Sequence, residues 1–432
     1  MLLLPFWNVF EVSRSRIKRK ESQMERALGM ILAGGRGRRM ELLCHLRPKP
    51  VLPFAGSLRV IDFSLSNCVH SQVRSMAVLV DYQRSYMAEY LREWGAANAG
   101  SAKISVLQPE AGSYTGTANA VYRNLSYLNT QAGDRVLILA GDHVYRMDYR
   151  NMLAFHEQAK ADATVGVIRV PTEQAHRFGT VVVNSERRIQ EFVEKSSRPL
   201  STLASMGIYV FNKDILIKRL IEDASIRDSL HDFGYSVLPD MVRRDRVFAY
   251  EFSGYWQDIG TVEAYYQANM ELLIPHPRFS LDSNWPVLSD DNALPVPEGS
   301  KDGKVVNSLI SPGCIIKGHV QSSVLSPGVH VEDQAVIRNS IVMANTHVGY
   351  HSIVDGCILD EGVRIGKFCY IGFGNSLFPG QWDITVLGKE VVVPSHSAIG
   401  RKCKVLPKAG PDDFGGSLVP SGTVIKTGAK TQ

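Results

Sequence analysis

The chain has 432 residues, of which 44% are hydrophobic and 21% charged, and its formal net charge is +5 at pH 7. This length exceeds the usual size of one hydrophobic core, so we expect more than one domain. The composition is that of an ordinary globular protein and excludes a fibrous or wholly disordered chain. A net excess of three positive charges lies in residues 1–23, so the charge balance does not indicate a nucleic-acid partner.

Residues 1–23 form a separate segment in which an apolar part precedes a basic part. The apolar part, residues 1–10, is too short to span a bilayer. The basic residues follow it, which is the reverse of a secretory signal. We therefore interpret residues 1–23 as a disordered extension, or as a start assigned upstream of Met24. An anchor on a membrane surface is the alternative.

Six cysteines are scattered along the chain, and none forms a C-x-x-C pair. This spacing predicts neither a zinc site nor a disulfide framework. We expect buried free thiols, a cytoplasmic location and no membrane partner.

From residue 28 to about residue 250, apolar runs alternate with stretches of helical spacing. Runs typical of buried strands are 28–33, 76–80, 104–107, 136–140, 163–170 and 207–211. Helical spacing is found at 86–94, 118–128, 149–159 and 265–273. Thr117 is the candidate N-cap of the second of these helices. The alternation predicts an α/β domain with a mainly parallel sheet that is covered on both faces.

Prolines and small polar residues accumulate over residues 276–304, which predicts a linker. Beyond it, a strand-like pattern starts at Asn307, Ser322, Asn339 and Gly356, at spacings of 15, 17 and 17 residues, and a turn follows each copy. Three short strands per coil would give this period, so we expect a parallel β-helix of hexapeptide type. A β-sandwich, the alternative, would not keep a near-constant register over four coils.

A glycine-rich turn follows the first predicted strand. Gly34 and Gly35 let the backbone approach a phosphate chain closely, and Arg36, Arg38 and Arg39 supply positive charge. The segment matches neither the P-loop nor the dinucleotide-binding fingerprint. Arginines after glycines are equally compatible with a solvated loop.

Three further cations are candidates for phosphate contacts. Arg47 and Lys49 lie in a segment that alternating prolines hold extended, although an ordinary turn would have the same sequence. Lys195 follows Glu194 at the end of a strand-like stretch, where the lysine would bind a sugar phosphate and the carboxylate would accept sugar hydroxyls. An adjacent Glu–Lys pair is more often a solvated surface pair.

Two carboxylates are candidates for a metal site. Asp142 directly follows a predicted strand, and Asp258 lies in the segment 254–260. An octahedral Mg²⁺ needs one or two protein carboxylates in addition to phosphate oxygens. A helix N-cap for Asp142 and a turn for Asp258 are the alternatives.

These segments, in this order, resemble the sugar-1-phosphate nucleotidylyltransferases, and among them the bacterial glucose-1-phosphate adenylyltransferases. The most specific matches are residues 59–67, 141–149, 204–211, 231–234 and 256–261. The resemblance implies a Rossmann-like catalytic domain at 24–275, and a left-handed parallel β-helix at 305–432 for oligomerisation and regulation. It also implies a homotetramer with small-molecule allosteric effectors, which makes ADP-glucose and pyrophosphate from ATP and glucose 1-phosphate for glycogen synthesis.

The resemblance further implies roles for individual residues. Asp142 and Asp258 would bind Mg²⁺, and Arg39, Lys49 and Asp142 would act in catalysis. The positions that correspond to sugar-phosphate contacts are Gly179, Glu194, Lys195 and Ser205. The positions that correspond to nucleotide contacts are Leu32, Gly34, Gly35, Tyr114 and Gly116.

The sequence departs from the family pattern in loops near the expected site. Ser113 and Asn119 replace a tryptophan and an aspartate, and Val80-Asp81 replaces a Thr-Gln pair implicated in activation. Leu46 stands where some members carry an activator-binding lysine, and Tyr235 where lysine is common. These departures concern regulation and the triggering of catalysis more than the chemistry itself.

Three alternatives remain open at this point. The chain could be a non-catalytic regulatory subunit of the same fold, or a pyrophosphorylase for another sugar 1-phosphate or nucleotide. It could also be an acyltransferase built on the β-helix, for which the available histidines are His319, His330, His347 and His351. The complete set of nucleotidyltransferase segments favours a structural and regulatory β-helix over the third alternative.

Overall fold

The computed structural model describes residues 27–281, 283–290, 296–298, 304–374 and 383–428. These residues form two compact units: the chain up to Gly35 together with Phe63–Trp256, and Arg36–Asp62 together with the chain from Gln257 onward. The predicted extension at 1–23 and part of the predicted linker lie outside the described residues. By their contacts, residues 36–62 and 257–275 belong with the β-helix. The domain boundaries at 24–275 and 305–432 stay a prediction.

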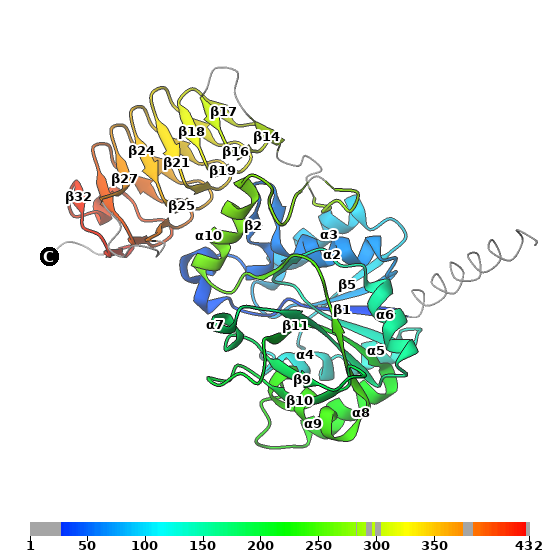
Figure 1. Cartoon of the computed structure of the whole chain (residues 1–432). Helices are drawn as coiled ribbons and strands as arrows, with labels where there is room; N and C mark the ends of the chain where they lie inside the picture. Colours follow the sequence, from blue (N-terminus) through cyan, green and yellow to red (C-terminus); the bar gives the residue numbers. More distant parts are fainter. Residues whose placement is uncertain (1–26, 282, 291–295, 299–303, 375–382, 429–432) are drawn as a thin grey trace, which may run out of the picture. The chain divides into compact units, whose positions relative to one another are not determined.

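The first unit is built on a nine-stranded sheet with the order β10-β9-β11-β6-β1-β4-β5, in which β8 also pairs with β11 and β12 (Figure 1). The strands are β1 (Ala27–Leu32), β4 (Ser75–Leu79), β5 (Lys103–Leu107), β6 (Arg135–Ala140), β8 (Ala163–Arg169), β9 (Thr180–Val183), β10 (Ile189–Val193), β11 (Leu203–Asn212) and β12 (Val247–Glu251). The pairs β1–β4, β1–β6, β4–β5 and β8–β12 are parallel. The six predicted strands are confirmed within a few residues. The sheet is mixed rather than mainly parallel, because β11 runs antiparallel to β6 and β8.

Helices pack on this sheet, for example α3 on β5, α6 on β8 and α9 on β10. The α-helices among the described residues are α2 (Val60–His70), α3 (Arg84–Asn98), α4 (Thr117–Tyr122), α5 (Leu125–Thr130), α6 (Tyr149–Gln158), α7 (Thr172–Ala175), α8 (Lys213–Ala224), α9 (Leu238–Arg244) and α10 (Val262–Met270). The helix predicted at 118–128 is two helices, because Asn124 leaves the helical conformation and its side-chain amide donates to Ala120 O (2.8 Å). The N-cap prediction for Thr117 is wrong. Gly116 occupies that position, and the Thr117 hydroxyl donates to Asp232 Oδ2 (2.8 Å) instead.

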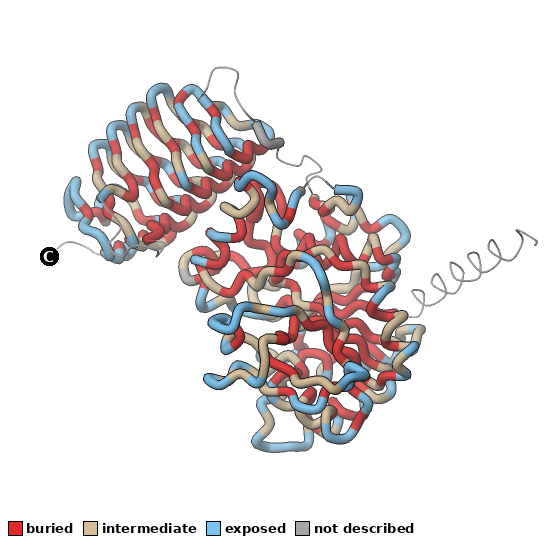
Figure 2. Tube along the Cα trace, viewed as in Figure 1, coloured by how far each residue is buried: buried red, intermediate tan, exposed pale blue. Residues whose placement is uncertain are grey.

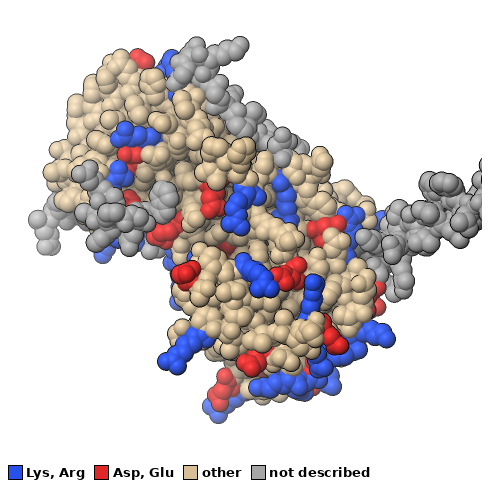
Figure 3. All heavy atoms as spheres, viewed as in Figure 1, with Lys and Arg blue, Asp and Glu red and all other residues tan. Residues whose placement is uncertain are grey.

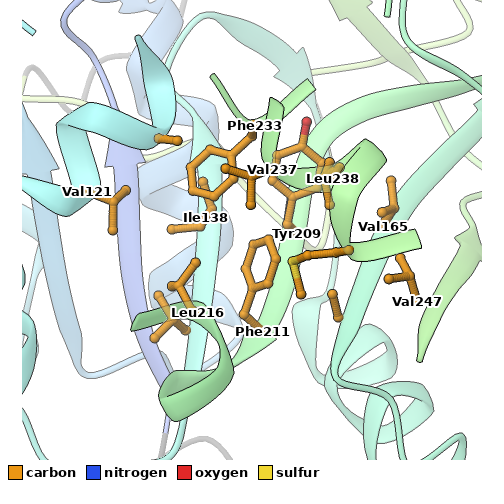
Figure 4. Packing of buried hydrophobic residues seen from close by; sticks show 14 of the residues in the cluster. Val121, Ile138, Val165, Tyr209, Phe211, Leu216, Phe233, Val237, Leu238 and Val247 are labelled. Atoms are coloured by element: carbon orange, nitrogen blue, oxygen red, sulfur yellow. The ribbon is translucent and has the colours of Figure 1, made fainter. Parts of the chain in front are cut away.

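An aromatic cluster anchors β11 in the core of the first unit (Figure 4). The rings of Phe211 and Phe233 stack with centroids 5.6 Å apart, and the ring of Tyr209 lies 5.7 Å from that of Phe233. Such pairs add stability beyond the area that they bury. Buried residues follow the strands of this sheet in Figure 2. Since β11 lies at the centre of the sheet, this cluster holds the strand that carries Ser205.

The buried His156 is expected to make the protein less stable in acid. Its Nδ1 lies 2.8 Å from Thr164 Oγ1 and its Nε2 3.2 Å from Asn212 Oδ1, and burial lowers its pKa to about 4. The unfolded state therefore binds the proton first, so that stability is present above the unfolded pKa and falls as the pH falls below it. As the pH falls from about 7 to about 5, the free energy of unfolding should decrease by about 2 kcal/mol because of His156.

Urea unfolding of the wild-type chain and of His156→Gln at both pH values checks this expectation. The variant should lose less free energy of unfolding on acidification than the wild-type chain does. Equal losses in the two proteins would contradict the prediction.

The second unit contains a parallel β-helix of three sheets, whose coils stack from yellow to red in Figure 1. One sheet contains β14 (Val296–Glu298), β16 (Ser308–Ile310), β19 (Val324–Leu325), β22 (Ile341–Val342), β25 (Cys357–Leu359), β28 (Thr385–Leu387), β31 (Lys404–Val405) and β33 (Val424–Ile425), with β14 antiparallel to β16. The next contains β15 (Val305–Val306), β18 (His319–Gln321), β21 (Val336–Arg338), β24 (Ile353–Asp355), β27 (Tyr370–Phe373), β30 (Ala398–Gly400) and β32 (Leu418–Val419). The third contains β17 (Ile315–Ile316), β20 (His330–Val331), β23 (His347–Val348), β26 (Arg364–Ile365) and β29 (Val392–Val393).

The predicted repeat coincides with a repeated backbone corner. Asn307, Ser322, Asn339 and Gly356, which start successive copies of the pattern, all have positive φ, at 47°, 46°, 49° and 63°. Glycine and asparagine enter this left-handed region most readily. Each corner joins a strand of the seven-stranded sheet (β15, β18, β21 or β24) to a strand of the eight-stranded sheet (β16, β19, β22 or β25), and its recurrence once per coil produces the near-constant period.

Segments from two distant parts of the sequence pack with the β-helix in the second unit. Strands β2 (Pro53–Phe54) and β3 (Leu58–Arg59) form a hairpin, and Tyr265 Oη of α10 donates to Pro53 O (2.6 Å). Tyr266 Oη of the same helix donates to Asn339 O in the β-helix (2.6 Å). Leu273, in the 3₁₀ turn after α10, packs with Leu309 and Val324. Residues 36–62 and α10 are therefore integral to the second unit.

None of the helices in the described part of the chain is long and apolar enough to cross a membrane. Lysine and arginine side chains are interspersed with aspartate and glutamate on the face seen in Figure 3, without gathering into one basic field. This distribution matches the near-neutral charge of the chain beyond residue 23.

Candidate active site

The carboxyl ends of β1, β4 and β6 meet at one edge of the sheet, because these strands are parallel neighbours. Leu32 pairs in register with Leu79 on one side and with Ala140 on the other. Gly141 N donates to Leu32 O (3.1 Å), which continues the ladder past the end of β6. This edge therefore places the predicted nucleotide residue Leu32 beside the loop that carries Asp142.

The glycine-rich turn after β1 is closely packed on one side and open on the other. A Cβ atom on Gly34 would lie 3.2 Å from Asp81 Cβ and 3.6 Å from Tyr114 Cδ2, so a larger residue would need its neighbours to move. A Cβ atom on Gly35 would meet none of the described atoms within 4 Å. Tyr114 is thus brought to the predicted phosphate-binding turn, as the nucleotide assignment requires, and Gly35 leaves room for a ligand beside the backbone.

The loop that departs from the family pattern is tied to residues 230–231. A side chain at Gly116 would collide with the carbonyl oxygens of Leu230 and His231. Asn119 N donates to His231 O (3.0 Å), and Asn119 Oδ1 accepts from Thr115 N (3.2 Å). Gly116 therefore has a packing role whether or not it contacts nucleotide, and Asn119 holds the shape of its own loop.

Asp142 is oriented by a chain of two further side chains. Trp256 Nε1 donates to His143 Nδ1 (3.3 Å), and the two rings meet edge to face at 78°. A histidine that accepts at Nδ1 carries its proton at Nε2 when neutral. That Nε2 lies 3.5 Å from Asp142 Oδ1, so His143 directs a positive dipole at the carboxylate. Both residues occur in the matched segments, yet the sequence offers no signal for their contact.

A buried polar network from α2 holds the loop around Asp142. Ser64 Oγ donates to Ala140 O (2.7 Å), two residues before Asp142. Asn67 Nδ2 donates to Tyr145 O (3.3 Å), and Asn67 Oδ1 accepts from Met147 N (3.2 Å). Buried polar groups that are satisfied in this way restrict a loop to one conformation. Ser64 and Asn67 therefore hold the loop that carries Asp142 in position.

The predicted sugar-phosphate residues form a second cluster at β9, β10 and β11. Lys195 Nζ lies 2.9 Å from Glu194 Oε1, and Ser205 N donates to Gly179 O (2.7 Å). Side chains at Gly179 or Gly234 would collide with Glu194 Oε2, so both glycines make room for this carboxylate. The structure thus brings all four predicted residues together.

The charge of Lys195 is maintained by its neighbours. Burial lowers the pKa of Lys195, but Glu194, Tyr235 and Asp232 together raise it, so the net shift is upward and the ammonium stays protonated. Its Nζ also lies 5.8 Å from the centroid of the Tyr235 ring. About half of the Lys195 side chain is exposed, whereas that of Glu194 is 12% exposed. A cation held in this way remains accessible to an anionic ligand.

The remaining predicted residues, Arg39, Lys49 and Asp258, belong to the second unit. Lys49 is buried in a short 3₁₀ helix (Lys49–Val51), and its Nζ lies 3.6 Å from Asp258 Oδ1. Arg39, in the 3₁₀ helix Arg38–Cys44, lines a pocket of about 90 Å³ together with Lys402 and Lys404. The sequence placed Lys49 and Asp258 in separate motifs, and the structure brings them together.

Arg47 does not have the phosphate-binding role that its segment suggested. Its Nη2 lies 2.6 Å from Asp360 Oδ1 and 3.2 Å from Glu361 Oε2, and its side chain is 2% exposed. Its charge is therefore directed into the β-helix. No local pattern indicates this, because the partners are more than 300 residues away along the chain.

Comparison with known proteins agrees with this architecture. The model of the nucleotidyl transferase family matches residues 28–274, and that of the GlmU-like C-terminal hexapeptide family matches residues 295–391. The chain is therefore a nucleotidyltransferase with a C-terminal hexapeptide β-helix.

Similarity to individual proteins extends over nearly the whole chain. A protein of Acetivibrio thermocellus is 39% identical over 420 residues, which cover 94% of this chain and 99% of the relative. A protein of Thermomicrobium roseum is 42% identical over 413 residues, covering 92% and 96%, and one of Fervidobacterium nodosum 37% over 421 residues, covering 94% and 99%. All three are named glucose-1-phosphate adenylyltransferase. The chain belongs to the glucose-1-phosphate adenylyltransferase family.

Proposed function

We propose that this chain transfers the adenylyl group of ATP to glucose 1-phosphate, giving ADP-glucose and pyrophosphate. The observation that carries this proposal is the similarity to glucose-1-phosphate adenylyltransferases over more than nine tenths of the chain. A phosphate oxygen of the sugar phosphate forms the new bond to the α-phosphorus, and the bond from that phosphorus to the bridging oxygen breaks. Pyrophosphate leaves with the electron pair. Positioning and charge neutralisation supply most of the catalysis in such displacements.

The triphosphate is proposed to lie at the carboxyl edge of β1 and β6, against the backbone of Gly34 and Gly35. Arg39 and Lys49 would stabilise the negative charge that develops on the leaving pyrophosphate. Carboxylates are the ligands that Mg²⁺ prefers, so Asp142 and Asp258 fit this ion by their chemistry. When bound there, Mg²⁺ would neutralise phosphate charge. Lys49 would orient Asp258, and His143 would orient Asp142.

Lys195→Gln is expected to raise the KM for glucose 1-phosphate by about 10- to 100-fold, because a charge-assisted hydrogen bond is lost. The kcat should change much less, since we assign this contact to both the ground state and the transition state. Initial rates at saturating ATP measure both constants. Lys218→Gln, which changes an exposed lysine on α8, is the matched control and should leave both constants unchanged. If Lys195→Gln changed only the KM for ATP, the assignment of Lys195 to the phosphate of glucose 1-phosphate would be contradicted.

The proposed reaction is tested by pyrophosphate release in the presence of glucose 1-phosphate and Mg²⁺, with ATP, GTP, UTP and dTTP offered separately. Release with ATP alone is the expected result. Release with another nucleotide would indicate a different pyrophosphorylase. Binding of glucose 1-phosphate without release from any nucleotide would indicate a non-catalytic subunit. The altered loop with Ser113 and Asn119 is the feature that favours this second candidate function.

We further propose a homotetramer in the cytoplasm that is regulated by small-molecule effectors. The resemblance to the glucose-1-phosphate adenylyltransferases is what supports the tetramer and its regulation. None of the six cysteines, which all lie among the described residues, is in a disulfide, and this supports a reducing compartment. Light scattering of the purified chain tests the tetramer, and titration of glycolytic intermediates into the rate assay tests the regulation.

A further inference from the structure

Two histidines and a glutamate meet on the outside of the β-helix. Strands β20 and β23 are parallel neighbours, and their register places His330 opposite His347 and Val331 opposite Val348. Both valines are fully buried in the β-helix core. Because side chains alternate along a strand, His330 and His347 point away from the core, and Glu332 points to the same side as His330.

The distances in this cluster are those of a ligand set. Glu332 Oε1 lies 3.3 Å from His347 Nε2 and 3.7 Å from His330 Nε2. One ligand atom from each of the three residues lies within 4.8 Å of the other two. Ligands bound at 2.0–2.1 Å in a tetrahedral arrangement are about 3.3–3.4 Å apart. The distance of 3.3 Å between Glu332 and His347 already has this length, whereas the distance of 3.7 Å between Glu332 and His330 would have to shorten by a few tenths of an ångström.

One ring nitrogen of His330 is buried without a hydrogen-bond partner among the described residues. This atom is Nε2, and its distance of 3.7 Å to Glu332 is too long for a hydrogen bond. A buried polar atom without a partner is uncommon in native proteins and calls for a ligand or an ion.

We propose that His330, Glu332 and His347 bind a divalent transition-metal ion of the Zn²⁺ type, with water in the remaining position. Imidazole nitrogens and one carboxylate suit Zn²⁺ better than Mg²⁺, which prefers oxygen ligands. The site is separate from Asp142 and Asp258 and does not depend on the proposed reaction. The ion would join two successive coils, because its ligands come from β20, from the residue after it, and from β23.

The neighbouring cations leave room for the ion. Lys317 Nζ lies 3.9 Å from Glu332 Oε2, and its side chain is 55% exposed, so it can turn into solvent when the carboxylate binds a metal. Arg364 is the next residue in register after His347, on β26, and is exposed. Because Lys317 competes for Glu332, Lys317→Met should bind the ion at least as tightly as the wild-type chain.

The test is Zn²⁺ binding by the full, tag-free chain after removal of metals, measured by calorimetry with excess Mg²⁺ present to occupy the catalytic centre. We expect one Zn²⁺ per chain, and affinity lower by on the order of 100-fold in His330→Gln/His347→Gln. Glu332→Gln provides a second variant that retains both rings. His319→Gln, at an exposed histidine of the same β-helix, is the matched control and should bind as the wild-type chain does.

Co²⁺ substitution separates this site from the cysteines. The absorption of bound Co²⁺ should show nitrogen and oxygen ligands without a thiolate charge-transfer band, and Zn²⁺ should raise the unfolding temperature of the wild-type chain but not of the double variant. Failure of the wild-type chain to bind Zn²⁺ would overturn the proposal. Equal Zn²⁺ affinity of the wild-type chain, of His330→Gln/His347→Gln and of Glu332→Gln would overturn it as well.

Discussion

Asp142→Asn is expected to lower kcat by about 10³-fold or more, which corresponds to the loss of at least about 4 kcal/mol of transition-state stabilisation. Asparagine has nearly the same shape and can still face His143 Nε2, which lies 3.5 Å from Asp142 Oδ1. What it lacks is the charge that a divalent cation requires of its ligand. The substitution therefore isolates the metal-binding role from the packing of the loop. Single-turnover and steady-state rates with ATP and glucose 1-phosphate measure the effect.

Asp148→Asn is the matched control for this experiment. Asp148 lies six residues further along the same segment, where it caps α6 by accepting from Arg150 N (3.0 Å) and also pairs with the Arg150 side chain. Asparagine is nearly as good an N-cap as aspartate, so this variant should keep its activity. An Asp142→Asn variant that keeps a near-normal rate would remove Asp142 from the metal site. Loss of assembly in that variant would instead indicate a structural role.

The parts of the fold that were predictable from the sequence depend on periodicity. The strands of the sheet are recognisable as short apolar runs, and the coils of the β-helix by their repeated corners at Asn307, Ser322, Asn339 and Gly356. The orientation of β11 was not predictable, because an apolar run carries no information about which way a strand runs in the sheet. The error at Thr117 has a similar origin: its hydroxyl bonds to Asp232, which lies 115 residues further along the chain.

In the candidate site, too, some features were predictable from the sequence and others were not. The positions of Leu32 and Asp142 follow from the rule that parallel strands end at one edge, and Glu194 and Lys195 are neighbours in the sequence. The orienting contact of Trp256 with His143 and the burial of Arg47 could not be predicted, since each joins side chains far apart in the sequence. The pairing of His330 with His347 required the register of the β-helix, although both residues were already candidates for chemistry.

The largest effect on stability is expected at Arg47. Its guanidinium and the Asp360 carboxylate are each 2% exposed, and burial raises the pKa of Asp360 by more than Arg47 lowers it. Removing the cation would leave a buried carboxylate without its principal countercharge, which typically costs about 3–5 kcal/mol. We therefore expect Arg47→Met to lower the free energy of unfolding by this amount, as measured by urea unfolding. Arg243→Ala, at an exposed ion pair with Asp240, should cost less than about 1 kcal/mol.

The double variant Arg47→Met/Asp360→Asn removes both charges of the ion pair. Comparing its free energy of unfolding with that of Arg47→Met shows how much of the destabilisation comes from leaving the Asp360 carboxylate buried without a countercharge. The asparagine side chain would carry no charge, and its carbonyl oxygen could still accept the hydrogen bond that Glu361 N now donates to Asp360 Oδ1 (2.6 Å). The double variant should therefore be more stable than Arg47→Met alone, by about 1 kcal/mol or more. If Arg47→Met cost no more than Arg243→Ala, Arg47 would not be buried against Asp360, and residues 36–62 would not be fixed to the β-helix by this ion pair. If the double variant were as unstable as Arg47→Met, lost packing of the arginine side chain rather than unpaired charge would account for the effect.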